Sequence, residues 1–143
     1  MRRLAAVAIG LVAVGSCGAG KDTPEVAAVR QQLALISDGQ YAGHWAELHP
    51  EQQAIIPKAD YVTCAQKRYG GVKVSVKKVT DDFDADITIP GTDVNAASKA
   101  VTVELRVDGA TKGTATVTYH EILVDGTWRW TTSDPASFNP ATC

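Results

Sequence analysis

The second half of the chain carries the pattern that most limits the fold, because apolar and polar residues alternate there with a period of two. The alternating segments are residues 72–76, 82–89, 101–107, 114–124 and 127–132. This period puts apolar side chains on one face of a strand. Asp108-Gly109 and Asp125-Gly126 supply turns, and the second is a strong two-residue hairpin signal. Since no helical spacing interrupts the run, we expect an antiparallel sheet.

The first half has helical spacing instead. Thr23-Pro24-Glu25 offers an N-cap hydroxyl, a proline at the first helical position and an acid in the first turn. The apolar stripe that follows is Val26, Val29, Leu33 and Ile36. Further segments are a helix with Tyr41, Trp45 and Leu48 on one face, a turn or short helix over 51–57, and a helix over 60–69. Helices followed by a meander predict an α+β domain with the helices on one face of the sheet.

Residues 1–16 have the features of an export signal. Arg2 and Arg3 precede an apolar stretch over residues 4–14, and small residues follow at Gly15 and Ser16. The apolar stretch is about half of the ~20 residues that a membrane-spanning helix needs. A cleaved signal is therefore expected rather than a transmembrane anchor. The Arg2-Arg3 pair leaves a twin-arginine export route open, although its flanking residues do not support that route.

The segment Val14-Gly15-Ser16-Cys17 resembles the lipobox of bacterial lipoproteins. The resemblance implies cleavage after Ser16, acylation of Cys17 with chains such as palmitate, and anchoring at the outer face of the cell membrane. Residues 17–22 would then be the lipidated cysteine and a short linker, and residues 23–143 the domain. The alternative is an ordinary secreted protein with Cys17 after the apolar run by chance.

Charge excludes one class of partner. The chain has 14 Lys+Arg against 16 Asp+Glu, a formal charge of −2. Without a basic excess, nucleic acid is not an expected partner. Removal of Arg2 and Arg3 with the signal would make the mature chain more acidic. The acyl chains would therefore hold it on an anionic membrane without help from charge.

The chain has three cysteines. If Cys17 is acylated, export to an oxidising compartment leaves one possible disulfide, between Cys64 and Cys143. The alternative is two free buried thiols. A metal site is not expected, because His44, His49 and His120 are scattered without ligand spacing.

The segment Asp38-Gly39-Gln40-Tyr41-Ala42-Gly43-His44-Trp45, after a long amphipathic helix, resembles the opening of NTF2-like (cystatin-like, ketosteroid-isomerase-type) domains. Leu48-His49-Pro50-Glu51, Tyr61-Val62-Thr63-Cys64 and the closing Asp125-Gly126-Thr127-Trp128-Arg129-Trp130 are similar to small exported members of that superfamily. The resemblance covers residues 23–143. It implies a curved sheet wrapped around the long helix, leaving a cone whose mouth can hold a ligand. Some relatives are ketosteroid isomerases or polyketide cyclases, and others are binding or dimerisation modules, so fold alone does not assign an activity.

The expected role is a non-enzymatic binding module for a small apolar molecule or a cell-envelope protein, with no cofactor. The candidate binding residues are Tyr41, Trp45, Tyr61, Tyr119, Glu121, Trp128 and Trp130. The two tryptophans and Tyr119 could form an aromatic wall, or they could equally be core. A structural dimer through the outer sheet face is a third possibility.

The rival is an isomerase- or dehydratase-like enzyme with Glu121 or His120 as a general base. Strand parity puts them on opposite faces, both of mixed character, and either could point inward. We favour a rim or solvent-facing position for each. No Asp/His pair has the spacing of a catalytic dyad, and this weakens the enzyme alternative. His44 is expected on a helix surface, and His49 at a helix end near terminal carbonyls.

The acidic segment 82–86 superficially resembles a calcium loop, with Asp93 at the twelfth position. Such loops need glycine at the sixth position, where this chain has Ile87. The favoured interpretation is a strand with an acidic outer face, which protects a sheet edge.

Overall fold

The computed structural model describes residues 20–143. Four helices come first: α1 (Pro24–Ser37), α2 (Tyr41–Ala46), α3 (Pro50–Ile55) and α4 (Lys58–Tyr69). The strands follow: β1 (Lys73–Thr88), β2 (Asn95–Asp108), β3 (Lys112–Val124) and β4 (Thr127–Trp130), then the 3-10 helix η1 (Pro135–Phe138). The expected α+β class is confirmed. The expected signal segment, Cys17 and the first linker residues lie outside the described residues.

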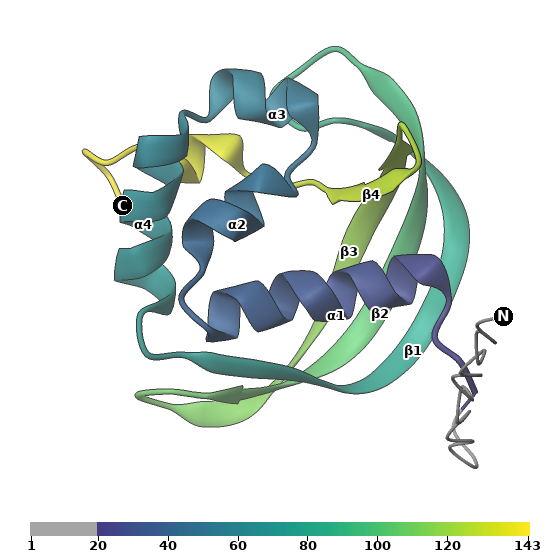
Figure 1. Ribbon diagram of the computed structural model, residues 1–143, viewed down its shortest axis with the longest axis horizontal. Coiled ribbons are helices and arrows are strands. Elements are labelled where there is room, and N and C mark those ends of the chain that lie inside the picture. The colour runs from purple at the N-terminus through teal and green to yellow at the C-terminus, as the bar shows by residue number, and fades with distance from the viewer. Residues whose placement is uncertain (1–19) are drawn as a thin grey trace, which may run out of the picture.

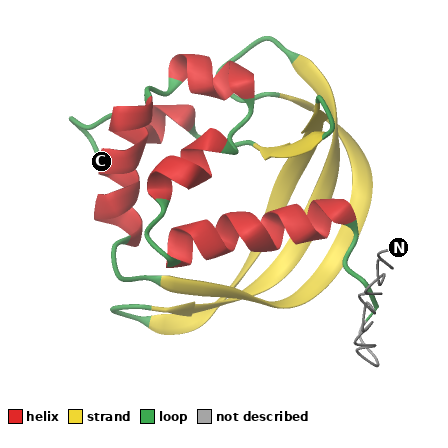
Figure 2. Ribbon diagram, viewed as in Figure 1, coloured by secondary structure: helices red, strands yellow, loops and turns green. Residues whose placement is uncertain are grey.

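The four strands form one antiparallel sheet in the order β1-β2-β3-β4. The sheet curves around α1, and the other helices lie on the same side (Figures 1 and 2). Asp125 and Gly126 close the β3–β4 hairpin with φ of 49° and 78°. Two positive φ values are what a type I′ turn requires, so this predicted hairpin is confirmed.

Two bulges bend β1. The sequence predicts separate strands over 72–76 and 82–89, and this is wrong, because one strand of 16 residues runs through both. Its register against β2 shifts between Val76 and Lys78 and again between Val79 and Asp81. Each extra residue breaks the alternation and increases the local twist.

The acidic residues of β1 lie on the face opposite to the one expected, because the two bulges cancel and return Asp82 to the face of Val76. Asp82 lies opposite Val101, which packs against α1, so the acidic side of β1 is the concave face and not the outer face expected. Asp82 Oδ2 accepts a hydrogen bond from the Thr23 hydroxyl at 3.0 Å. Thr23 holds the N-cap position of α1 but makes no side-chain cap, contrary to expectation. Asp84 pairs with Lys99 at 2.7 Å.

The interior contains two separate apolar clusters. The sheet core packs one face of α1 against β2 and comprises Val26, Val29, Leu33, Val101, Val103 and Leu105. The helix core joins the other helices to the end of the chain and comprises Tyr41, Leu48, Ile56, Tyr61, Cys64, Ala65, Trp130 and Phe138. These names are kept below.

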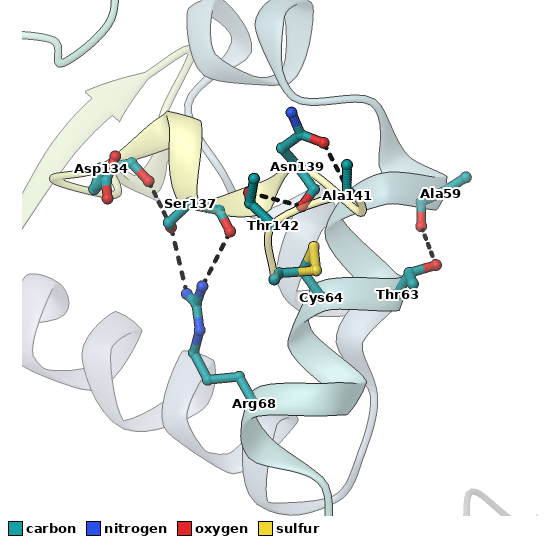
Figure 3. The surroundings of a disulfide bond; sticks show 10 residues. Ala59, Thr63, Cys64, Arg68, Asp134, Ser137, Asn139, Ala141 and Thr142 are labelled. Carbon is teal, nitrogen blue, oxygen red and sulfur yellow. Dashed lines mark hydrogen bonds between the residues drawn. A yellow bond between two sulfur atoms is a disulfide. The ribbon is translucent and has the colours of Figure 1, made fainter.

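A disulfide closes the helix core. The Sγ atoms of Cys64 on α4 and Cys143 are 2.04 Å apart, and the two residues are 79 positions apart in sequence. Figure 3 shows this bond beside Arg68, which reaches from α4 to Ser137 of η1. The chain after the sheet is therefore fixed onto α4 at two points. Within residues 20–143, no helix is long and apolar enough to cross a membrane.

Candidate functional site

The shortness of β4 opens one edge of the sheet. β4 pairs with β3 only over Glu121–Val124, so within the described chain residues 112–120 have no strand on that edge. Beyond Trp130 the chain leaves the sheet, because Gln52 of α3 holds Thr132. The Gln52 amide donates to the carbonyls of Thr132 and Pro90, both at 2.9 Å, and accepts from the Thr132 N–H at 2.8 Å. The strand predicted over 127–132 therefore ends two residues early.

A cavity of about 620 Å³ lies where the two cores fail to meet. The sheet core contributes Leu33 and Leu105 to its wall, and the helix core contributes Tyr61, Trp130 and Phe138. Valines of β1, β2 and β3 and the ring of Tyr119 complete the sheet side. A mostly apolar wall with a few polar groups, at this volume, is typical of sites for small molecules.

One wall of the cavity is an uncharged, tightly packed group of three rings. The His44 ring stacks on Trp130 with centroids 4.2 Å apart, and its Nδ1 is hydrogen-bonded to the Tyr61 hydroxyl. Trp130 Nε1 donates to the His44 carbonyl at 2.9 Å. Burial lowers the pKa of His44 to about 3 and raises the pKa of Tyr61. His44 is therefore neutral at physiological pH.

Arg68 and Asp134 carry the formal charges on the cavity wall. The Arg68 guanidinium lies 4.9 Å from the Phe138 ring centroid and donates to the Ser137 carbonyl at 3.1 Å (Figure 3). These contacts fix its position, as cation–π and hydrogen-bonding contacts do together. Arg68 is exposed to solvent, so charge is available at the rim while the rest of the wall is largely apolar.

Three of the seven predicted binding residues, Tyr61, Tyr119 and Trp130, line this cavity. Tyr41 and Trp45 belong to the helix core or pack against it, and the Trp45 indole donates to the Ile56 carbonyl at 2.9 Å. Trp128 lies elsewhere, in a shallow groove against the start of α1. The cone surface expected from the sequence is thus divided between different parts of the molecule.

Glu121 is fully buried, so the expectation of a rim or solvent-facing position is wrong. Its Oε2 accepts a hydrogen bond from Gln32 of α1 at 3.0 Å, while its Oε1 has no partner in the described chain. Burial raises the pKa of Glu121 to about 8, Gln32 opposes that rise, and the Glu47 charge adds to it. Glu121 is not a wall residue of the cavity.

His44 and His49 also differ from expectation. His44 is buried rather than on a helix surface. His49 begins α3, where Nδ1 accepts from the Glu51 N–H at 3.2 Å, instead of meeting carbonyls at a helix end. His120 lies on the outer face, 3.1 Å from the Ser98 hydroxyl, beside a second cavity of about 510 Å³ that shares Tyr119 and Trp130 with the first.

Sequence reasoning missed several wall residues. The buried residues of α2 are Tyr41 and His44, and Leu48 is buried just after the helix, whereas the predicted stripe had Trp45 in place of His44. Both sets of residues fit helical spacing, and the larger apolar ring of Trp45 favours the set that proved wrong. Arg68 and Phe138 gave no signal, because their meeting depends on where η1 packs.

Within residues 20–143, no group of three or more His, Cys, Asp or Glu side chains could hold a metal ion. No protein-family model matches the chain, and a search of curated proteins finds no match.

Proposed function

We propose that this protein is an exported, lipid-anchored lipoprotein whose NTF2-like domain binds a small apolar molecule. The lipobox-like segment ending at Cys17 supports the anchor. Helices held against one face of a curved antiparallel sheet support the NTF2-like assignment. A cell-envelope protein is the alternative occupant, and a bare cavity in protein taken from its own membrane would favour it.

The cavity between the two cores carries the proposal. Its volume of about 620 Å³ suits a small molecule, and its neutral His44–Tyr61–Trp130 wall suits an uncharged, largely apolar one. Hydroxyl groups of Tyr69, Tyr119 and Thr132 could orient such a ligand. Only two of the wall residues, Arg68 and Asp134, carry a formal charge.

Binding is favoured over the isomerase- or dehydratase-like alternative by the position of the candidate bases. Glu121 lies beneath α1 with no exposed surface, and a general base must come within hydrogen-bond reach of its substrate. His120 points away from α1, toward the second cavity of about 510 Å³. Neither residue is placed to act on a ligand in the cavity between the cores.

Equilibrium dialysis with the neutral apolar probe N-phenyl-1-naphthylamine tests the proposal. Val117→Trp would fill the cavity, whereas Thr116→Trp adds the same ring on the exposed face of β3 as a matched control. We expect the wild type and the control to bind alike, and Val117→Trp to bind at least about tenfold more weakly, which corresponds to about 1.4 kcal/mol. Equal binding by all three would contradict it.

A further inference from the structure

We propose that the β3–β4 hairpin contacts the lipid bilayer beside the anchor and holds the cavity at the far end of the domain. The inference rests on the lipid anchor of the proposed function. Its structural basis is an exposed apolar pair at the end of the molecule where the tether enters.

Leu123 and Trp128 form that pair. They lie directly opposite each other in the β3–β4 ladder, so their side chains share one face. Leu123 is 54% exposed, the largest exposed fraction among the large apolar side chains of the described chain, and Trp128 is partly exposed. A tryptophan beside an exposed leucine is suited to the boundary between headgroups and acyl chains.

The linker that would join the acylated Cys17 to the domain, called the tether here, meets the domain beside this pair. Trp128 shares a groove with Pro24, Ala27 and Ala28 in the first turns of α1. Figure 1 shows the start of α1 and the β3–β4 hairpin on the same side of the molecule. Residues 18–22 separate Cys17 from Thr23, a reach of roughly 17 Å when extended. An acylated Cys17 would therefore hold this end of the domain close to the bilayer.

The cavity lies toward the other end of α1. Leu33 and Ile36, in the last turns of that helix, line the cavity, whereas Pro24 and Ala27 line the hairpin groove. The helix has 14 residues and is about 21 Å long. A domain seated on Leu123 and Trp128 would therefore receive its ligand from the aqueous side and not directly from the bilayer.

Acidic side chains near the hairpin predict a lipid preference. Asp125 lies in the turn itself. Asp84 and Asp86 lie on the concave face of β1, at the same end of the sheet as the hairpin. The bases near them are Lys99, which pairs with Asp84, and Arg129 of β4, so a surplus of one acidic charge remains among these groups. The hairpin should therefore contact a zwitterionic bilayer more closely than an anionic one, and added salt should reduce this difference.

Quenching by brominated phosphatidylcholine tests the contact. The lipidated chain is reconstituted in these vesicles, and its tryptophan emission is compared with that of Trp128→Phe to isolate the Trp128 signal. The control is Trp128→Phe with Thr111→Trp, which puts a tryptophan beside the β2–β3 turn, at the opposite end of the sheet in Figure 1. We expect the bromines to reduce the Trp128 signal about twofold, to leave the signal of the tryptophan introduced in the control unchanged, and to act less in Leu123→Ser.

Vesicle flotation separates the possible failures. If the protein floats with the vesicles but Trp128 is not quenched, or only the control is quenched, the hairpin contact is wrong while the anchor stands. If the protein does not float and its mass lacks the acyl chains, the anchor itself is wrong and the contact fails with it.

Discussion

Gln32 of α1 donates its side-chain amide to Glu121 of β3 over 3.0 Å, at a site with no access to solvent. Gln32 Oε1 and Glu121 Oε1 have no partner among the described residues. Since burial raises the pKa of Glu121 to about 8, the carboxyl is largely protonated at neutral pH. A protonated Glu121 has a hydrogen to donate, and Gln32 Oε1 is an unpartnered acceptor on the neighbouring side chain.

The contribution of Glu121 to stability should fall as pH rises from about 4.5 to about 8. Over this range the unfolded chain releases the Glu121 proton and the folded chain keeps it, which lowers the free energy of unfolding by up to about 1.4 kcal/mol per pH unit. Glu121→Gln should remove this contribution, because an amide does not titrate. Urea unfolding at several pH values measures the difference. Gln32→Met, which leaves the acid buried, should keep the slope, and an unchanged slope in Glu121→Gln would contradict the assignment.

His44 should act in the opposite direction. Burial lowers its pKa to about 3, so below about pH 6.5 the unfolded chain takes up a proton that the folded chain does not. The contribution of His44 to stability should therefore fall with decreasing pH, by up to about 1.4 kcal/mol per unit, and between about pH 4.5 and 6.5 it opposes the contribution of Glu121. His44→Asn should remove this acid-side loss in the same unfolding series. Tyr61→Phe removes the hydrogen-bond partner and keeps the imidazole, so its loss of stability should leave the slope in place.

Among the polar residues outside the cavity, Gln52 should be the one whose substitution lowers the free energy of unfolding most. Its side chain satisfies three backbone groups, of Pro90 and Thr132, at a position with no solvent access. Gln52→Leu should cost about 2–4 kcal/mol, because it leaves buried backbone groups without partners. The neighbouring Gln53→Leu is the matched control and should cost less, since Gln53 is only partly buried. Equal unfolding midpoints for the two variants would contradict this role.

Reduction of the Cys64–Cys143 bond should lower stability by about 4 kcal/mol in the chain-entropy model. The bond closes a loop with a sequence separation of 79 residues, which restricts the unfolded chain strongly. Denaturation with and without dithiothreitol measures the loss. Cys64→Ser with Cys143→Ser should match the reduced wild type and be insensitive to dithiothreitol. Sensitivity of that double variant would show that the reagent acts elsewhere.

Local signals in the sequence predicted the elements well and their faces less well. Asp125-Gly126 specified its hairpin because a type I′ turn needs two positive φ values. The faces of β1 could not be read in the same way, because the bulges after Val76 and Val79 cancel each other, so that Asp82 shares the face of Val76 and Phe83 lies on the opposite face. A bulge depends on the partner strand, and one strand read alone does not show it.

The candidate site was less predictable for a related reason. Tyr61, Tyr119 and Trp130 could be named as large rings, but Glu121 required the register of three strands and its contact with α1. The cavity itself depends on where β4 ends, and that is decided by Gln52 from another helix. No local pattern distinguishes Gln52 from Gln53.

A native mass spectrum of the domain, released from its own envelope membranes by cutting within residues 18–22, shows directly whether the cavity holds a ligand. We expect an added mass that disappears on denaturation and is absent when Val117→Trp fills the cavity. A bare wild-type domain, or the same added mass on Val117→Trp, would contradict ligand binding between the two cores.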